Sequence, residues 1–240
     1  MKLSLIIPCF NEEKNLPLLI ERCEKVFSST GHEVILVENG STDNTCKVLP
    51  RLLSKHKNIR CVTVKKNQGY GFGILEGLKN AKGDILSWTH ADMQTDPADT
   101  LKGLSFFMDS DTPELLFVKG MRRGRPIMDV IFTVGMSIFE SILLRKIFWD
   151  INAQPTMFHR SMLNKWSNPP HDFSLDLYSY YYANIYRYKI KRFPVIFGER
   201  AHGISHWNVD FKSKIKFISR TIEFSFSLKK RLGKNANYTT

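Results

Sequence analysis

The sequence predicts an α/β protein with a mostly parallel central sheet flanked by helices, followed by a basic amphipathic helical extension at the C-terminus. Short apolar runs alternate with amphipathic stretches through the first half of the chain, which is the pattern of strand–helix–strand units. Near the end, lysines and arginines are interspersed among apolar residues at helical spacing. We therefore expect one α/β domain over residues 1–208 and an extension over residues 209–240.

The first half contains the clearest predicted elements. Strands are expected at 2–8, 33–37, 59–65 and 84–88, with helices at 13–26, 45–56 and 71–81. Strands that alternate with helices pair in parallel and are covered by helices on both faces. In the second half we expect strands at 115–118 and 193–197, and helices at 127–147, 172–188 and 211–232.

The composition is that of an ordinary globular protein, with 42% hydrophobic and 24% charged residues among 240. The four cysteines show no close paired spacing, so free thiols in a reducing cytoplasm are expected rather than zinc or disulfides. A spanning helix needs about 18 uncharged apolar residues. The best candidate, residues 127–148, contains Asp129, Glu140, Arg145 and Lys146, so no spanning helix is expected.

Polar and acidic residues follow three of the predicted strands. They form the segments 9–13 (CFNEE), 38–43 (ENGSTD) and 89–94 (THADMQ). In open parallel sheets, ligands bind outside the carboxyl ends of the strands, where such segments converge. The sequence therefore predicts a ligand site at this edge of the sheet.

These three segments, together with four others, resemble the family 2 glycosyltransferases, and within them the polyprenol-phosphate (dolichol-phosphate mannose synthase-like) branch. The segments that carry the resemblance are 4–13 (SLIIPCFNEE), 37–45 (VENGSTDNT), 67–69 (NQG), 81–84 (AKGD), 90–94 (HADMQ), 150–160 (DINAQPTMFHR) and 194–205 (PVIFGERAHGIS). The resemblance implies a GT-A (Rossmann-like) fold. It also implies inverting transfer of a sugar from a nucleotide-diphosphate sugar to a polyprenyl-phosphate, lipid-linked or cell-envelope glycan acceptor.

The resemblance further assigns a set of nucleotide-binding residues. These are Pro8, Phe10, Asn11, Glu12, Glu38, Asn39, Gly40, Ser41 and Gly69. The residues 11–13 also suit a plain helix start, because acidic residues favour the first turn of a helix. One departure is that Glu38 and Asn39 replace the two aspartates that the family usually carries, which removes one charge.

A divalent cation is expected at residues 90–94. Asp92 and Gln94 offer oxygen ligands on one short turn, which suits Mg²⁺ or Mn²⁺. His90 replaces the family's first aspartate and would supply a nitrogen, which favours Mn²⁺ and puts the metal requirement in question. The alternative is that Asp92 and Gln94 cap the following helix.

Arginines and one further aspartate complete the predicted catalytic set of Asp92, Asp176, Arg122 and Arg200. Guanidinium groups bind phosphate in a planar fork, and the resemblance favours Arg122 and Arg200 as phosphate contacts. Asp176 is the candidate base for a hydroxyl acceptor, whereas a lipid phosphate needs none; the alternative is a helix N-terminal charge. Residues assigned to the acceptor or a phosphate are Arg125, Ser205 and His206.

The net charge is +12, and residues 186–240 carry 13 Lys or Arg against 3 Asp or Glu, a net +10. A basic amphipathic helix at 211–232 favours peripheral contact with an anionic membrane at its inner, cytoplasmic face; it suits equally a helix that packs on the domain. No nucleic-acid partner is expected, because no RNA- or DNA-binding signature is present. The alternative function is a catalytically degenerate nucleotide-binding module on an anionic surface, which His90 favours. A nucleotidyltransferase is disfavoured by the acidic first loop.

Overall fold

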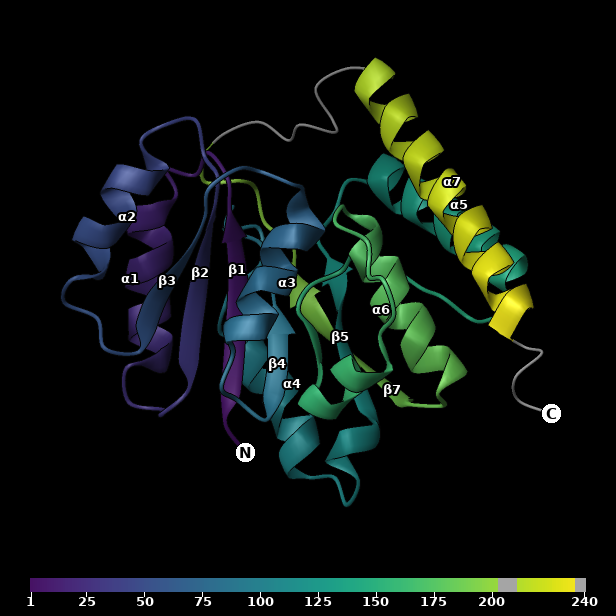
Figure 1. The fold of residues 1–240 in the computed structure, drawn as a ribbon, viewed down its shortest axis with the longest axis horizontal. Helices are drawn as coiled ribbons and strands as arrows, with labels where there is room; N and C mark the ends of the chain where they lie inside the picture. Colours follow the sequence, from purple (N-terminus) through teal and green to yellow (C-terminus); the bar gives the residue numbers. More distant parts are fainter. Residues whose placement is uncertain (203–210, 236–240) are drawn as a thin grey trace.

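The computed structural model describes residues 1–202 and 211–235, with side chains for all of these except 211–217 and 231–235. Seven strands and seven α-helices make up most of the described chain (Figure 1). The strands are β1 Leu3–Cys9, β2 Glu33–Asn39, β3 Ile59–Val64, β4 Ile85–Trp88, β5 Leu116–Arg123, β6 Thr156–His159 and β7 Lys189–Ile196. The helices are α1 Leu16–Phe27, α2 Thr45–Leu53, α3 Tyr70–Asn80, α4 Asp99–Met108, α5 Ile127–Leu144, α6 Ser174–Ile185 and α7 Phe211–Asn235.

One sheet of seven strands runs through the protein in the order β3-β2-β1-β4-β6-β5-β7. Pairs β1–β2, β1–β4, β2–β3 and β5–β7 are parallel. Strand β6 is antiparallel to both of its neighbours, β4 and β5. The sheet is therefore mostly parallel, as expected from the alternating pattern, with one reversed strand that the sequence did not reveal.

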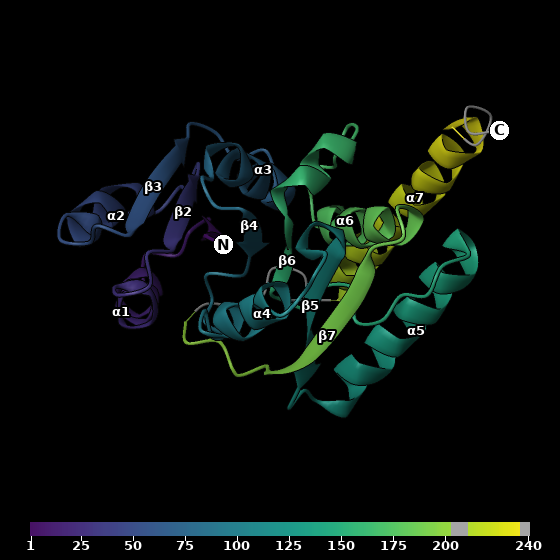
Figure 2. The same ribbon diagram turned by 90° about the horizontal axis from the view of Figure 1, so that it is seen from below.

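Helices cover both faces of the sheet, with α1 and α4 on one face and α3 and α6 on the other (Figure 2). The period-2 alternation of β1 sends Leu3, Leu5 and Ile7 into the core beneath α1, and Ile6 into the core beneath α3. Continuous burial on both faces explains why β1 and β2 are nearly uninterrupted apolar runs. The ends of these strands are consequently fixed in space and can position a site.

Helices α5 and α7 lie side by side at the far edge of the molecule (Figures 1 and 2). Leu228 of α7 is 2% exposed, and the Ser225 hydroxyl donates to Oε1 of Glu140 on α5 at 2.7 Å. The described part of the extension thus packs on the protein. The expected domain boundary at residue 208 falls outside the described residues and stays a prediction.

Helix α5 is the most apolar helix in the described part of the chain. Its 18 residues have a mean hydropathy of 1.9, and only 17% of this stretch is buried. By length and composition alone it is long enough and apolar enough to cross a membrane, despite Asp129 and Glu140. Helices of soluble proteins meet the same two criteria, so the expectation of no spanning helix stays a prediction.

Candidate active site

A cavity of about 580 Å³ opens at the carboxyl ends of the parallel strands. Its walls come from the segments after β1, β2, β4, β5 and β7 and from the start of α6. Eleven predicted site residues line it: Pro8, Phe10, Glu12, Asn39, His90, Asp92, Gln94, Arg122, Arg125, Asp176 and Arg200. The topology rule that predicted a site at this edge therefore places most of the predicted residues around one space.

The other predicted nucleotide residues build the loops around the cavity rather than lining it. Asn11 has φ 58°, and its Oδ1 accepts hydrogen bonds from the backbone N–H groups of Thr42 at 2.8 Å and Asp43 at 3.3 Å. The Ser41 hydroxyl accepts from the Asn11 N–H at 3.1 Å, and Glu38 Oε1 accepts from the Ser41 N–H at 2.7 Å. These contacts lock the loop after β1 onto the loop after β2.

Two glycines allow the loop after β3 to lie close to the loop after β2 and to the segment before α6. Gly40 has φ +68°, and a Cβ there would lie 2.3 Å from the backbone nitrogen of Asn67. Gly69 has φ +114°, and a Cβ there would lie 2.3 Å from the carbonyl oxygen of His171. Only glycine suits both the backbone conformation and the space. Gly40 and Gly69 thus shape the site without facing it.

Asn39 is the β2 residue that reaches the cavity. It is 1% exposed, and its Nδ2 donates to the Gly69 carbonyl at 3.0 Å. Its Oδ1 is buried and has no hydrogen-bond partner among the described residues. Because an unpaired buried acceptor is unfavourable, this atom is suited to receive a donor from a bound ligand.

Asp92 lies at the centre of the predicted metal segment and is 4% exposed. Its Oδ1 accepts from the Gln94 N–H at 3.1 Å, and its Oδ2 lies 2.8 Å from Nη2 of Arg200. Helix α4 begins only at Asp99, and it is Asp96 that accepts the Ala98 N–H. Capping of that helix is therefore not the role of Asp92 or Gln94.

Residues 90–94 bring three candidate metal ligands to the cavity, although the described residues contain no cluster of three His, Cys, Asp or Glu side chains that could hold a metal ion. His90, Asp92 and Gln94 all line the cavity, and Gln94 Oε1 has no hydrogen-bond partner in the described part of the chain, because its contact with Gly198 uses Nε2. Burial lowers the pKa of His90 and keeps its imidazole neutral. A mixed nitrogen and oxygen set of low charge suits Mn²⁺ better than Mg²⁺. Arg200 would have to share Asp92 with the cation.

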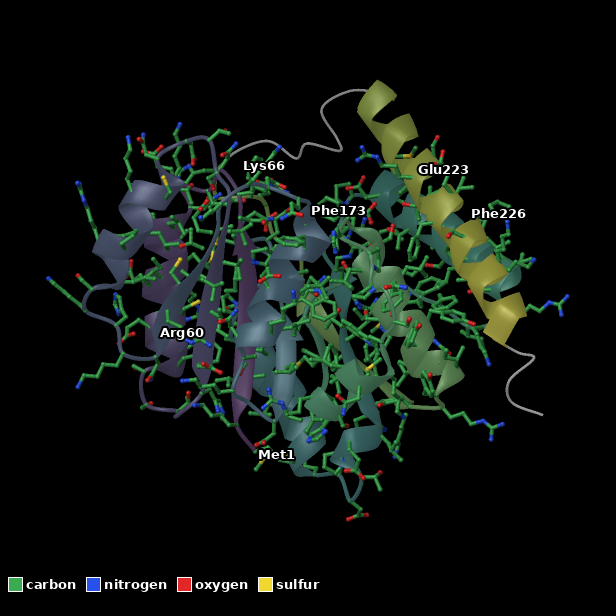
Figure 3. All side chains as sticks on the ribbon, in the orientation of Figure 1. Met1, Arg60, Lys66, Phe173, Glu223 and Phe226 are labelled. Atoms are coloured by element: carbon green, nitrogen blue, oxygen red, sulfur yellow. The ribbon has the colours of Figure 1, made fainter. Side chains whose placement is uncertain are left out.

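Aromatic rings form a wall between the loops and α6. Tyr70 stacks on Phe173 with ring centroids 4.5 Å apart, and its centroid is 5.4 Å from that of His90. Figure 3 places Phe173 at the upper edge of the sheet, near α3 and α5. This wall was not predicted. The tyrosines Tyr178, Tyr180 and Tyr181 of α6 are by contrast core residues, at most 5% exposed.

Two arginines, Arg122 at the end of β5 and Arg125 just after it, form the opposite end of the cavity. Arg122 donates from its N–H and Nε to Asp150 at 2.9 and 2.8 Å, and Arg125 Nη1 lies 3.8 Å from the same carboxylate. Burial opposes ionisation of Asp150, but the charge and hydrogen bonds of Arg122 hold its pKa below the usual value. Both guanidinium groups also lie over the ring of Phe197, at 5.3 and 5.7 Å from its centroid. Asp150 is thus the carboxylate that both arginines contact, and Asp129 lines the same end of the cavity.

Sequence reasoning missed several residues of the site. Asp150 and Gln154 lie in the 150–160 segment that carried the family resemblance, and only the fold shows which partners they meet. The sequence did not indicate Lys119 as a site residue, because β5 was expected to end at residue 118 and in fact runs to Arg123. Ser205 and His206, assigned to the acceptor, lie outside the described residues.

The fold places the protein in the class of GT-A-type α/β proteins, and its cavity lies at the carboxyl ends of the parallel strands. The chain belongs to the family Glycosyl transferase family 2, which matches residues 4–127, or 124 of the 240 residues. It is accordingly a glycosyltransferase, as the sequence motifs predicted.

Two curated relatives named undecaprenyl-phosphate 4-deoxy-4-formamido-L-arabinose transferase are similar to part of the chain. The protein from Yersinia enterocolitica is 33% identical over 99 residues, which are 40% of this chain and 30% of the relative. The protein from Pectobacterium carotovorum is 37% identical over 97 residues, which are 39% of this chain and 30% of the relative. The matched region is thus less than a third of the length of these relatives.

Solved structures share the fold at low sequence identity. Glucosyl-3-phosphoglycerate synthase from Mycobacterium tuberculosis, in complex with Mn²⁺, uridine-diphosphate-glucose and phosphoglyceric acid, has a TM-score of 0.71 at 16% identity. The match covers 95% of this chain and 79% of that one. A second structure, described as a mycobacterial protein, has a TM-score of 0.68 at 18% identity, and the match covers 85% of this chain and 68% of that one.

Proposed function

We propose that this glycosyltransferase moves a sugar from a nucleotide-diphosphate sugar to the phosphate of a polyprenyl-type lipid carrier. The observation that carries the proposal is the single cavity of about 580 Å³ that joins the loops after β1, β2 and β4 to Arg122 and Arg125. One end suits a nucleotide and the other suits a second anion. The relatives named for undecaprenyl-phosphate support this acceptor class.

At the donor end, Asn39 and Glu12 would contact the nucleoside, with the loops held by Asn11 and Ser41. Burial raises the pKa of Glu12, which lies near Asp92 and Arg200. A divalent cation held by His90, Asp92 and Gln94 would supply positive charge to the diphosphate leaving group. Arg200, 2.8 Å from Asp92, would contact the same phosphates.

At the acceptor end, a narrow cavity of about 50 Å³ continues from the main one. The two cavities share Arg122, Phe132, Thr133, Asn152 and Phe173. The narrow cavity also has an apolar lining, formed by Met136, Ile151 and Leu177. A phosphate at the arginines, with only the first carbons of its hydrocarbon chain in the small apolar cavity, matches this order of surfaces.

In the proposed reaction, a phosphate oxygen of the acceptor attacks the anomeric carbon of the sugar. The bond between that carbon and the nucleoside diphosphate breaks, and the diphosphate leaves with the electron pair. A single displacement of this kind inverts the anomeric centre. The acceptor is already an anion, so no base is required; with a hydroxyl acceptor, Asp176 would have to serve as the base.

The edge formed by α5 and α7 supports peripheral binding to an anionic membrane. Helix α5 and the turn after it expose Ile127 (75%), Met128 (71%), Ile142 (74%) and Ile147 (84%). On α7, Phe226 is 54% exposed and lies on the outer side of the helix, as Figure 3 shows. Exposed Arg220, Lys229 and Lys230 lie on the same helix. Apolar residues beside basic ones suit the headgroup region at the cytoplasmic face.

The test is a transfer assay with undecaprenyl phosphate in anionic vesicles and a panel of UDP-, GDP- and CDP-linked sugars, with Mn²⁺ or Mg²⁺. We expect one donor to give a glycosyl-phosphoryl lipid detectable by mass spectrometry, and Arg125→Ala to reduce its formation. Binding of a nucleoside diphosphate without transfer to any lipid phosphate would instead favour the degenerate nucleotide-binding module, for which His90 in place of the usual aspartate is the supporting observation.

A further inference from the structure

A buried ion pair lies beneath the cavity, between β5 and the start of α6. Lys119 is 0% exposed and Asp176 is 1% exposed, and Lys119 Nζ lies 3.7 Å from Asp176 Oδ1. The ammonium group also donates to Oγ1 of Thr156 at 2.5 Å. Burying two charges is unfavourable unless they are paired and hydrogen-bonded, so this pair is a feature that requires a function or a compensating network.

The contacts of Asp176 are all made by one of its two carboxylate oxygens. Oδ1 accepts from Trp88 Nε1 at 3.2 Å, from Gln154 Nε2 at 2.8 Å and from Thr156 Oγ1 at 3.4 Å, besides its contact with Lys119. Oδ2 has no partner within the described residues, and Asp176 lines the main cavity. One oxygen is therefore committed to the protein and the other is available to a ligand.

Lys119 supplies a positive charge beside Asp176. Burial lowers the pKa of Lys119 to about 8, against the opposing effect of Asp176, so the ammonium form persists at neutral pH. This cation and three hydrogen-bond donors all lie on the Oδ1 side of Asp176. An ionised carboxylate is a pure acceptor and binds groups that donate, above all hydroxyls.

The surroundings of Asp176 match the surface of a sugar. Gln154 Nε2 lies between the carboxylate and the Tyr70 hydroxyl, at 2.8 and 3.5 Å. The Tyr70–Phe173 stack supplies an aromatic wall that can cover the apolar C–H face of a pyranose ring. His90 and Asp92 of the donor end line the same cavity.

We propose that Oδ2 of Asp176 accepts a hydrogen bond from a hydroxyl group of the transferred sugar, and that Lys119 is the positioning residue that holds Asp176 for this contact. This inference rests on the proposed function and names its sugar subsite. The subsite takes a neutral sugar with a free hydroxyl facing α6. It disfavours a uronic acid, because two carboxylates would then meet in a poorly solvated space.

The experiment measures binding calorimetrically with Mn²⁺ present, using UDP, GDP, UDP-glucose, UDP-N-acetylglucosamine, UDP-glucuronic acid and GDP-mannose. The proteins are the wild type, Asp176→Asn, Lys119→Met, the double variant, and Lys79→Met as control. Lys79 also forms an ion pair, with Glu76 at 2.6 Å, but on the exposed side of α3. Thermal unfolding of each variant verifies folding, and the double variant removes both buried charges if Lys119→Met alone is too unstable.

We expect each nucleoside diphosphate to bind all variants within about twofold of the wild type. The dissociation constant of the neutral nucleotide sugar relative to its diphosphate should rise about tenfold or more in Asp176→Asn, the range for a hydrogen bond to a charged group. Lys119→Met should show a similar rise, and the double variant no more than Asp176→Asn alone, because Lys119 acts through Asp176. A merely structural role would alter binding of the diphosphate as well.

An unchanged ratio in Asp176→Asn would overturn the proposal, and so would binding of a diphosphate without binding of any of these nucleotide sugars. Tighter binding of UDP-glucuronic acid than of UDP-glucose would also contradict it. Failure of both UDP and GDP to bind the wild type would contradict the proposed donor site itself, and with it the inference. A loss in Lys119→Met that adds in full to that of Asp176→Asn would refute the positioning role.

Discussion

Oδ2 of Asp92 lies 2.8 Å from Nη2 of Arg200, and this contact joins the segment after β4 to the segment after β7. Two further hydrogen bonds reinforce it: the Gly198 N–H donates to the Gln94 carbonyl at 2.8 Å, and the Gln94 side chain donates from Nε2 to the Gly198 carbonyl at 3.2 Å. A carboxylate and a guanidinium thus meet where a diphosphate and its counter-ion are expected. The Asp92 carboxylate and the Arg200 guanidinium can each be removed by a separate substitution.

Asp92→Asn should abolish most of the transfer activity while the fold survives. The substitution keeps the size of the side chain and its contact with the Gln94 N–H, but removes the charge that faces Arg200 and a cation. We expect kcat/KM to fall about 100-fold or more, as for loss of a group that stabilises the leaving group. Wild-type turnover in this variant, with thermal unfolding unchanged, would show that Asp92 has no catalytic role.

Nucleotide binding should raise the melting temperature, and Mn²⁺ should enlarge the shift more than Mg²⁺. A ligand at about 100 times its Kd adds roughly 2.7 kcal/mol, which is a shift of about 5 to 11 °C for a protein of this size. His90→Asp should reverse the metal preference, because a third oxygen ligand favours Mg²⁺. A preference that is identical in wild type and variant would exclude His90 as a ligand. No shift with UDP, GDP, CDP or ADP would contradict the donor site.

Stability should fall as the pH rises through 7, owing to Glu140. This residue is 0% exposed between α5 and α7, and burial raises its pKa to about 7, with the Ser225 hydroxyl as a weaker opposing effect. The folded state holds the proton more tightly than the unfolded chain. The contribution of Glu140 to the free energy of unfolding is therefore full below about pH 4.5 and is lost as the pH rises through 7. The change is on the order of 3 kcal/mol.

Glu140→Gln should remove this dependence, because the amide stays neutral at every pH and can still bind Ser225. Chemical denaturation at pH 5 and pH 8 measures it: the variant should gain stability over the wild type at pH 8 only. Glu223→Gln on the exposed side of α7 is the matched control (Figure 3). If the free energy of unfolding changed equally between pH 5 and pH 8 in wild type and Glu140→Gln, a proton on Glu140 would be ruled out.

Gly40→Ala should destabilise the protein by about 2 kcal/mol or more, because a non-glycine residue at φ +68° is strained. The new Cβ would also meet the backbone nitrogen of Asn67 at 2.3 Å. Gly135→Ala in α5 is the opposite case, since its Cβ would meet nothing within 4 Å. We expect that change to stabilise by about 0.5–1 kcal/mol. Urea unfolding of both variants gives the comparison, and a neutral Gly40→Ala would refute the described loop geometry.

Vesicle sedimentation tests the membrane edge. Replacing Ile131 and Ile142 of α5, 58% and 74% exposed, by glutamate should reduce binding to anionic vesicles at least tenfold, since each isoleucine contributes about 1.5–3 kcal/mol on burial. Leu18→Glu is the control, because Leu18 is 44% exposed on α1, across the molecule from α5. If the α5 variant bound vesicles as tightly as the wild type, the α5 surface would not be the one that binds the membrane.

Much of the donor half was predictable because its signals are local. Strand β1 is a buried apolar run, and the polar residues after each parallel strand converge at one edge by a general rule. The family resemblance then assigned nucleotide roles to particular residues. It did not show that Asn11 and Ser41 bind each other's loops, because that depends on the distance between two turns.

The second half was less predictable because its partners are distant in the sequence. Strand β6 has only four residues, Thr156–His159, and pairs with strands on both sides that precede it in the chain. Lys119 looked like a loop residue, and only its place on β5 beside Asp176 shows that it is buried. The Tyr70–Phe173 stack joins residues about a hundred positions apart, which no local pattern encodes.

The reversed strand β6 has a consequence for how such a protein can change over time. It lies between β4 and β5, and thus divides the sheet into a part that holds the nucleotide loops and a part formed by β5 and β7. The family match ends at residue 127, where the second part has contributed only β5. The cavity draws on both sides of that point, because Arg122 and Arg125 precede residue 127 whereas Asp176 and Arg200 follow it. Mutations beyond the matched region can therefore alter either end of the cavity.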